Sequence, residues 1–194
     1  MATSRREEIV AAATELFAQH GFHAVGMRAI ADAVGIRGSS LYHYFPSKLD
    51  LLHAIAKEAT TEFIETQLPS VAADPSRAAS LRRLIREHIL YFHDHRQEEA
   101  VGLRELQELR DNAPEQYLAF QKIRRSYQTG IEDIITAGID NGEFVCDDAH
   151  LATLAILGMV NSVNDWFRLS GQYTIDDVAS AYSELAVTRI LGAD

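Results

Sequence analysis

The stretch MRAIADAVGIRGSSLYHYFPSK, residues 27–48, predicts two short helices joined by a tight turn and followed at once by a third helix. Apolar side chains recur at steps of three and four within residues 27–34, which places them on one face of a helix. Gly35 ends that helix, because glycine adopts the left-handed conformation without steric cost. The second helix is expected over 38–45 and stops before Pro46, since helical geometry is disfavoured for a residue that precedes proline.

The outward face of this second helix has small side chains at its start and aromatic, hydrogen-bonding side chains after them. Its members are Gly38, Ser39, Ser40, Tyr42, His43 and Tyr44, and none is a carboxylate. A helix-turn-helix unit places its second helix in the major groove of DNA, with the N-terminal residues nearest the bases. This face therefore predicts contact with phosphates and base edges. The alternative is a pair of ordinary core helices with a polar outer face.

The same stretch resembles a known family. IADAVGI at 30–36 and LYHYFPSK at 41–48, with the LL soon after, are similar to the DNA-binding domain of the TetR family of bacterial transcriptional regulators, and the similarity covers about residues 9–56. The resemblance implies an all-α chain with a three-helix DNA-binding domain at 1–47 and a larger helical ligand-binding and dimerisation domain at 48–194. It also implies a homodimeric regulator, usually a repressor, that binds a palindromic operator on double-stranded DNA.

The resemblance assigns roles to individual side chains. Those expected to contact base edges or thymine methyl groups are Arg28, Ser39, Ser40 and Tyr42. Those expected to position phosphates are Tyr42, His43, Tyr44 and Lys48. Arg37 stands where the family usually has serine, and it adds a positive charge beside the second helix. The two recognition helices of a dimer are expected to enter successive major grooves, with half-site centres about 34–36 Å apart.

Charge is distributed unevenly along the 194 residues, whose net charge is −10. Residues 1–57 hold six basic and five acidic residues, whereas residues 58–194 hold 12 basic and 23 acidic residues. A roughly neutral N-terminal part joined to an acidic body is compatible with DNA binding through one end. Because few phosphates can be neutralised, we expect modest non-specific affinity for DNA.

The remaining chain is expected to be helical, with no strand. Ser4 and Glu7 form a capping-box pattern at the start of a helix over 5–20. The other helices are expected at 47–68, 75–95, 98–109, 115–140, 148–169 and 174–191. Asp74 and Pro75 are interpreted as the cap and the first residue of the second of these.

The helix expected over 47–68 links the DNA-binding domain to the body. Ser47 is a favourable N-cap, and the helix is expected to end near Pro69. Lys48 lies in its first turn, beside free backbone N–H groups, where a DNA phosphate could be held. Any change in the angle of this helix is therefore expected to move the recognition helix.

The last two helices are the candidates for a dimer interface. Residues 148–169 are apolar nearly all round, and a helix that is apolar on every side has to be covered on every side. Residues 174–191 add a second apolar face, so the pair is expected to form a four-helix bundle across a two-fold axis. The resemblance gives the last two helices the same role. The alternative is that both helices complete an internal core.

Polar side chains interrupt the apolar faces of the body and indicate a small-molecule site. Buried hydrogen-bonding groups need partners, and a ligand cavity uses such groups to orient its ligand between apolar walls. The side chains expected to line this site are His88, Phe92, Arg104, Tyr127, Asn161 and Trp166. Each of them could equally be satisfied inside a core.

A second resemblance concerns the ligand. LRELQELRDNAPEQY at 103–117 and AILGMVNSVNDWFRLSG at 155–171 are similar to TetR regulators that respond to acyl-coenzyme A thioesters of fatty, aromatic or steroid acid catabolism. No cofactor is expected, and the effector would be such a thioester. Lys122, Arg124 and Arg125 could hold its phosphates or could form a solvated helix face. Another hydrophobic small molecule, such as a drug or antibiotic, is the alternative effector.

The sequence does not favour an enzyme. His93 and His95 are two residues apart on a helix and point to different sides, and no glycine-rich phosphate loop is present. A metal enzyme and a helical interaction module that never meets DNA are the rival classes. The single cysteine, Cys146, excludes an intramolecular disulfide and favours a reducing compartment. Because neither a signal pattern nor a long apolar run is found, we expect a cytoplasmic protein without membrane contact.

Overall fold

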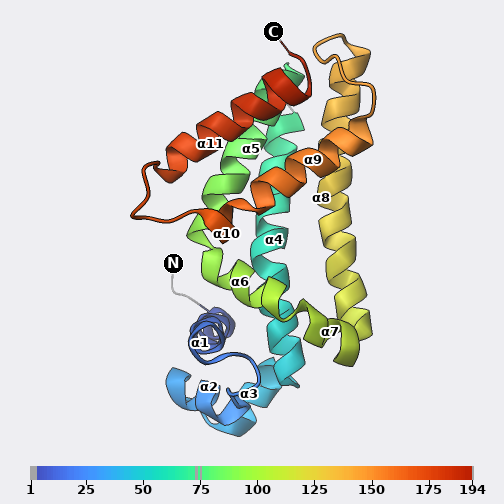
Figure 1. Cartoon of the computed structure of the whole chain (residues 1–194). Coiled ribbons are helices and arrows are strands. Elements are labelled where there is room, and N and C mark those ends of the chain that lie inside the picture. Colours follow the sequence, from blue (N-terminus) through green and yellow to red (C-terminus); the bar gives the residue numbers. More distant parts are fainter. Residues whose placement is uncertain (1–3, 73, 75, 194) are drawn as a thin grey trace. The chain divides into compact units, whose positions relative to one another are not determined.

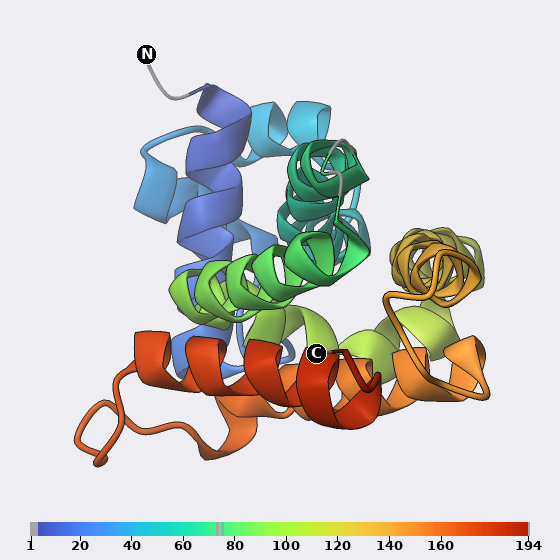
Figure 2. The ribbon, with the colours of Figure 1, turned by 90° about the horizontal axis from the view of Figure 1, so that it is seen from above.

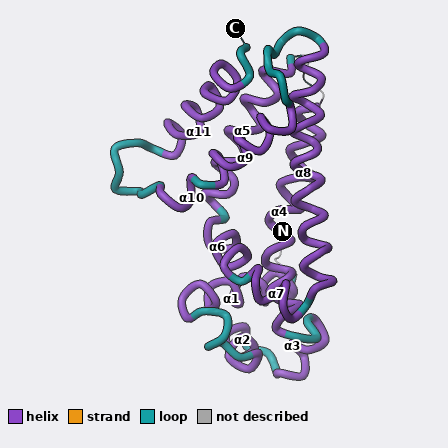
Figure 3. The backbone as a smooth tube through the Cα atoms, turned by 45° about the vertical axis from the view of Figure 1, so that its right-hand side comes forward, coloured by secondary structure: helices purple, strands orange, loops and turns teal. Residues whose placement is uncertain are grey.

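The structure is a computed structural model that describes residues 4–72, 74 and 76–193, without the side chains of residues 59, 70–72, 103 and 104. Within these residues every regular element is a helix (Figure 3), which confirms the all-α class. The elements are α1 (Arg5–His20), α2 (Met27–Val34), α3 (Gly38–Tyr44), α4 (Lys48–Ala72), α5 (Arg77–Asp94), α6 (Arg96–Arg104), α7 (Leu106–Asn112), α8 (Pro114–Asp140), α9 (Ala149–Asn161), α10 (Val163–Trp166) and α11 (Ile175–Glu184), followed by a π-helical turn at Leu185–Ile190 (Figure 1).

The chain forms two compact units. Unit 1 comprises the residues up to Thr60 together with His95–Ile123, and unit 2 comprises Thr61–Asp94 together with the residues from Arg124 onward. Both units are therefore built from two separate segments, and α4 and α8 each contribute residues to both. The functional division predicted at residues 47 and 48 stays a prediction.

Unit 1 begins with a well-capped helix. The Glu7 N–H donates to Ser4 Oγ at 3.2 Å and the Ser4 N–H donates to Glu7 Oε2 at 2.8 Å, which is the predicted capping box. Gly21 follows α1 with a φ of 82°, so the chain can turn back without a steric penalty. Phe22 then packs edge-on against Phe17, with ring centroids 5.2 Å apart.

The helix-turn-helix forms as predicted. Gly35 adopts the left-handed conformation at φ 71°, and its N–H donates to the carbonyl groups that end α2. Leu41 and Phe45 turn inward and are buried at 0% and 3% exposure. Phe45 already has extended geometry, so α3 ends at Tyr44, one residue earlier than predicted. The residue before Pro46 is thereby kept out of the helix.

The core of unit 1 also contains residues from α6 and α7. The prediction of a single helix over 98–109 was wrong, because α6 begins at Arg96, and Glu105, at φ −99° and ψ 9°, leaves helical geometry. This break allows Val101 and Leu109, which are 2% and 0% exposed, to join the same core.

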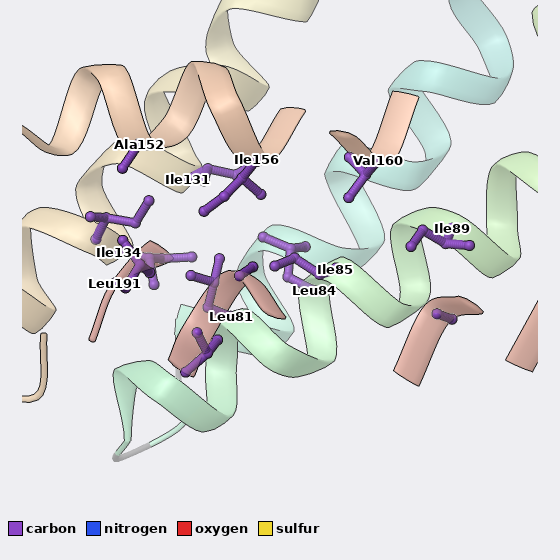
Figure 4. Close-up of a cluster of buried hydrophobic side chains, with 14 of the residues drawn as sticks. Leu81, Leu84, Ile85, Ile89, Ile131, Ile134, Ala152, Ile156, Val160 and Leu191 are labelled. Carbon is purple, nitrogen blue, oxygen red and sulfur yellow. The ribbon is translucent and has the colours of Figure 1, made fainter. Parts of the chain in front are cut away.

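The helices of unit 2 pack around a largely aliphatic core. α11 lies alongside α5 (Figure 2). Figure 4 shows side chains from α5, α8 and α9 converging on one cluster with Leu191. The labelled members of this cluster are Leu81, Leu84, Ile85, Ile89, Ile131, Ile134, Ala152, Ile156, Val160 and Leu191. One face of α5 therefore belongs to this core.

Two predicted helix boundaries near prolines were wrong. α4 continues through Pro69 to Ala72 instead of ending near Leu68. Proline removes one backbone hydrogen bond, and here the helix runs on for only three residues beyond it. α5 begins at Arg77, and Ser76 Oγ accepts from the Ala79 N–H at 3.2 Å, whereas the Asp74 carboxylate accepts from the Ser76 N–H at 3.3 Å. Pro75, predicted as the first helical residue, lies outside the described residues.

The N-terminus of α5 is capped from a distant part of the chain. Glu143, in the turn after α8, accepts from the backbone N–H groups of Arg77 at 3.1 Å and Ala78 at 2.9 Å, and from Ser76 Oγ at 2.9 Å. These N–H groups would otherwise lack partners in the first turn of the helix. They hold the pKa of Glu143 down at about 2, from an ordinary value of 4.5.

The single helix predicted over 148–169 was also wrong. α9 ends at Asn161, a short α10 follows, and Phe167 is extended. Ser162 Oγ donates back to the carbonyl group of Met159 at 2.8 Å, which offers the backbone an alternative to continued helix. Residues 167–174 then form an irregular loop before α11 begins at a Thr174 capping box.

Candidate nucleic-acid interface and buried polar cluster

Most side chains predicted to contact DNA are exposed in unit 1. On α3, Tyr42 is 52% exposed and Tyr44 is 44% exposed, while the buried Leu41 anchors the opposite side of the helix. Ser39 and His43 are also exposed, whereas Gly38 and Ser40 are half-buried. A Cβ atom added to Gly38 would meet no atom within 4 Å, so the start of α3 is open to a partner.

The two arginines of the helix-turn-helix are also accessible. The Arg28 side chain is 94% exposed and lies 4.0 Å from Asp32 one turn along α2. Such an exposed ion pair contributes little, so the guanidinium remains free to turn toward a phosphate or base. Arg37 is the exposed N-cap residue of α3 and makes no side-chain capping bond. Asp32 is the only carboxylate in the sequence over 21–48.

Lys48 is placed differently from the other predicted DNA contacts. Its ammonium group donates to the carbonyl oxygens of Phe22 at 2.8 Å and Val25 at 3.1 Å, in the loop between α1 and α2. It also lies 4.1 Å from the centre of the Phe22 ring. The predicted N-cap is present beside it, because the Asp50 N–H donates to Ser47 Oγ at 3.1 Å. The side chain thus contacts the protein itself, and its role toward phosphate stays a prediction.

Three of the predicted ligand-site residues form a hydrogen-bonded cluster inside unit 2. The His88 ring lies between Tyr127 of α8 and Asn161 of α9: its Nδ1 is 2.9 Å from the Tyr127 hydroxyl, and its Nε2 is 3.1 Å from Asn161 Oδ1. Since an amide oxygen only accepts, Nε2 carries the proton and donates to Asn161, and Nδ1 accepts from Tyr127. Both ring nitrogens are therefore satisfied within the protein.

Aromatic rings enclose this polar cluster. Phe63 of α4 contacts the rings of His88 at 5.6 Å and Tyr127 at 5.4 Å, and Phe92 lies 4.8 Å from His88, all measured between centroids. Tyr91 packs on Phe63 at 5.2 Å. These distances fit favourable edge-to-face and tilted contacts between rings. Phe92 therefore lies where the sequence predicted it, whereas the central position of Phe63 was not predicted.

Burial keeps the cluster uncharged at neutral pH. Desolvation lowers the pKa of His88 from 6.5 to about 4, and the hydrogen bond to Asn161 opposes this only in part. Desolvation likewise raises the pKa of Tyr127. An isolated buried charge is costly, so neutral imidazole and phenol are the stable forms here. The cluster can exchange hydrogen bonds with a polar ligand but offers no fixed charge.

Trp166, also predicted for the ligand site, is not in this cluster. Trp166 is 43% exposed, and its ring contacts Phe167 at 6.3 Å and Tyr182 at 6.1 Å. Arg104 lies on α6, and its side chain falls outside the part of the chain that the structure describes. The structure therefore brings His88, Phe92, Tyr127 and Asn161 together and places Trp166 elsewhere in unit 2. Their binding of a ligand stays a prediction.

Two kinds of feature are absent from the described residues. No group of three or more histidine, cysteine, aspartate or glutamate side chains there is arranged to hold a metal ion. No helix among the same residues is long and apolar enough to cross a membrane.

The fold and the exposed α3 define a helical protein with a helix-turn-helix DNA-binding unit. Comparison with known proteins identifies its family. Residues 9–55 match the model of the bacterial regulatory proteins of the tetR family, and residues 74–190 match the tetracyclin repressor-like C-terminal domain. The chain belongs to the TetR family. It is a DNA-binding transcriptional regulator and not an enzyme, in agreement with the expectation from its sequence.

Relatives match the chain over almost its whole length. The fatty acid metabolism regulator protein of Bacillus subtilis (strain 168) is 28% identical over 186 residues, which covers 94% of each chain. The transcriptional repressor KstR2 of Rhodococcus jostii (strain RHA1) is 27% identical over 186 residues, covering 95% of this chain and 90% of the relative. The crystal structure of AibR in complex with isovaleryl coenzyme A and operator DNA shares the fold, with a TM-score of 0.82 at 22% identity, and covers 98% of this chain and all of AibR.

Proposed function

We propose that this regulator is a cytoplasmic, homodimeric repressor that binds a palindromic operator and is released from it by an acyl-coenzyme A thioester. The exposed face of α3 supports operator binding most directly. Tyr42, His43 and Tyr44 project from a helix whose other side is fixed in the core by Leu41, and the sequence around them, over residues 21–48, contains a single carboxylate, Asp32. Side chains held in this way can read base edges and position phosphates.

Exposed apolar residues support the homodimer. On α9, Leu151 is 63% exposed and Leu154 is 44% exposed, and Leu185 after α11 is 42% exposed. A Cβ atom added to Gly158, on the same α9, would meet no atom within 4 Å. Large apolar side chains left exposed on helices are typical of a protein interface. A second copy covering both helices would complete the four-helix bundle expected from the sequence.

The neutral cluster of His88, Tyr127 and Asn161 supports a ligand site in unit 2. Apolar walls with a few oriented polar groups are the usual composition of such sites. Asn161 is half-buried and is the partner that a ligand could replace with least rearrangement. A carbonyl oxygen, such as that of a thioester, accepts a hydrogen bond in the same way as Asn161 Oδ1 does.

The relatives support the choice of effector class. They include a fatty acid metabolism regulator and the repressor KstR2, and one protein of this fold was crystallised with a coenzyme A thioester and operator DNA together. The ligand would act by binding one form of the protein more tightly than the other, typically with about 1–3 kcal/mol of coupling. α4 and α8 each have residues in both units, so they provide the covalent route for this coupling.

The operator assignment is tested by selecting duplexes from a randomised pool with the purified protein. The proposal predicts a palindrome whose half-site centres lie about one helical turn apart. Tyr42→Ala should then lower affinity for that duplex about 10-fold or more, since a good base contact contributes about 1–3 kcal/mol. Tyr173→Ala, which removes a tyrosine that is 58% exposed in unit 2, is the matched control and should leave affinity unchanged. Selection of no palindrome, or full affinity in Tyr42→Ala, would contradict the proposal.

A further inference from the structure

The hydrogen bonds of the buried cluster of His88, Tyr127 and Asn161 run in one direction. Among the described residues, the Tyr127 hydroxyl has one hydrogen-bond partner, His88 Nδ1, and Tyr127 is 7% exposed. If the hydroxyl only accepted, its O–H group would be buried without an acceptor, which is costly. Tyr127 therefore donates to Nδ1, and the proton of the neutral imidazole lies on Nε2. His88 thus directs an N–H donor at Asn161 Oδ1, 3.1 Å away.

Asn161 is the member of the cluster that can leave it. It is half-buried, whereas His88 is 4% exposed, so the cluster is reached from the Asn161 end. It is also the last residue of α9, and its side chain can turn away without breaking a helix interior. Among the described residues, its amide makes no hydrogen bond besides that to His88. Two neutral groups form this bond, which therefore contributes only modestly, so another acceptor can compete for it.

A group that replaces the Asn161 amide has to accept a hydrogen bond from a buried, uncharged donor. A methylene group would leave the Nε2–H without an acceptor, and a carboxylate would bring a charge beside the rings of Phe63 and Phe92. A carbonyl oxygen satisfies the donor and adds no charge. The thioester carbonyl of an acyl-coenzyme A has both properties.

We propose that the Asn161 amide occupies the place of the ligand's carbonyl group, and that the ligand displaces it and takes the hydrogen bond from His88. The inference rests on the proposed effector class, and it adds which donor selects the ligand and which residue competes with it. Because Asn161 ends α9, the ligand breaks a hydrogen bond that holds this end of α9 to α5. The helix proposed for the dimer interface thereby loses an attachment whenever the ligand is bound.

The direction of the hydrogen bonds is tested first without ligand. NMR of the protein with isotope-labelled histidine shows which ring nitrogen of His88 carries the proton, and the signal missing from His88→Gln assigns the residue. The proposal predicts a proton on Nε2 and an unprotonated Nδ1 at neutral pH. A proton on Nδ1 would turn the chain of hydrogen bonds around, with the Asn161 amide as donor, and overturns the proposal.

Competition by Asn161 is tested by calorimetry with isovaleryl-, octanoyl- and benzoyl-coenzyme A and with coenzyme A alone. Asn161→Ala removes the competing acceptor, so the tightest-binding thioester should gain about 5-fold in affinity, whereas the unfolding free energy should fall. Coenzyme A has no acyl carbonyl and should bind both proteins equally. Asn164→Ala is the matched control, because it removes an amide that donates to the Phe92 carbonyl group at 3.0 Å, and it should not raise the affinity. Should Asn161→Ala lose its helical circular dichroism, Asn161→Ser takes its place under the same criterion.

The role of the carbonyl group is tested in Asn161→Ala with the thioether analogue of that thioester, which has a methylene group in its place. The thioester should bind about 5-fold more tightly or more, since only its oxygen accepts from His88. Equal affinity of the two compounds overturns the proposal, as does an unchanged or lowered thioester affinity in Asn161→Ala, or an equal gain for coenzyme A. If no thioester binds the wild-type protein, the proposed effector class fails and the inference fails with it, whereas the other outcomes overturn the inference alone.

Discussion

A Cβ atom added to Gly102 of α6 would lie 3.1 Å from both the Cα and the Cβ atom of Ala56 in α4, so these two helices meet at their backbones within unit 1. A Cβ atom at this position would require the α4 backbone to shift, which glycine avoids, although glycine costs about 1 kcal/mol in a helix interior relative to alanine. The contact brings α6 into the unit that carries the helix-turn-helix. We therefore expect a change in the packing of α6 on α4 to alter the position of the recognition helix α3.

Gly102→Val should destabilise unit 1 by about 2–3 kcal/mol, because the added side chain overpacks the contact with the α4 backbone. Urea unfolding followed by circular dichroism measures this. Ala100→Val, at an exposed position on the same helix, is the matched control and should cost about 0.5 kcal/mol through helix propensity alone. Equal effects of the two substitutions would show that α6 does not pack closely on α4.

The buried His88 should make stability depend on pH. Its pKa is lowered from 6.5 to about 4 in the folded protein, so the unfolded chain binds more protons between these values. Stability should therefore fall as the pH is lowered from about 6.5 to 4, by up to about 3 kcal/mol from this group. His88→Gln has no imidazole to titrate, and its urea unfolding free energy should decline less over that range. Parallel pH profiles for the two proteins would be inconsistent with a neutral, buried His88.

Tyr127→Phe should cost about 1–2 kcal/mol of unfolding free energy, because it leaves the buried His88 Nδ1 without its hydrogen-bond donor. Tyr173→Phe removes a hydroxyl group from an exposed tyrosine and should change stability by less than about 0.5 kcal/mol. Thermal and urea unfolding of both variants make the comparison. Equal stability of Tyr127→Phe and wild type would mean that the hydroxyl does not contribute to the cluster.

Glu143→Gln should lower the unfolding free energy by about 1 kcal/mol at pH 7, the usual cost of weakening a helix N-cap. The pKa of Glu143 is depressed from 4.5 to about 2, so its contribution is present above pH 4.5 and is lost as the pH falls toward 2. The difference from wild type should shrink over that range. Asp147→Asn, in the segment that follows, is the control. A constant difference at all pH values would rule out a charged cap.

Local patterns predicted α1 and the helix-turn-helix of unit 1 well. The capping box at Ser4 and the left-handed Gly35 each follow from interactions within a few residues, and both were confirmed. The direction of Lys48 could not be predicted in this way. Its carbonyl partners lie 23 and 26 residues away, and only the folded loop brings them within reach of the ammonium group.

In the predicted ligand site, too, local patterns did not predict contacts between residues far apart in the chain. Spacing along helices identified His88, Tyr127 and Asn161 as polar residues on apolar faces, and these three do meet. Trp166 was predicted for the same site, but the helix expected through residue 169 is broken after Asn161 and the Trp166 ring contacts Phe167 and Tyr182 instead. Glu143 was missed as the cap of α5 because no local pattern links a carboxylate to a helix that begins more than sixty residues earlier.

Release of the operator by a thioester tests the account most directly. The complex of the wild-type protein with its selected duplex is titrated with acyl-coenzyme A thioesters of varied chain and ring type, with the matching free acids and with coenzyme A, and duplex binding is followed by fluorescence anisotropy. We predict that at least one thioester weakens duplex binding by about 5-fold or more while its free acid does not, as expected for about 1–3 kcal/mol of coupling. Unchanged duplex affinity with every thioester, together with no thermal stabilisation of the DNA-free protein, would contradict the account.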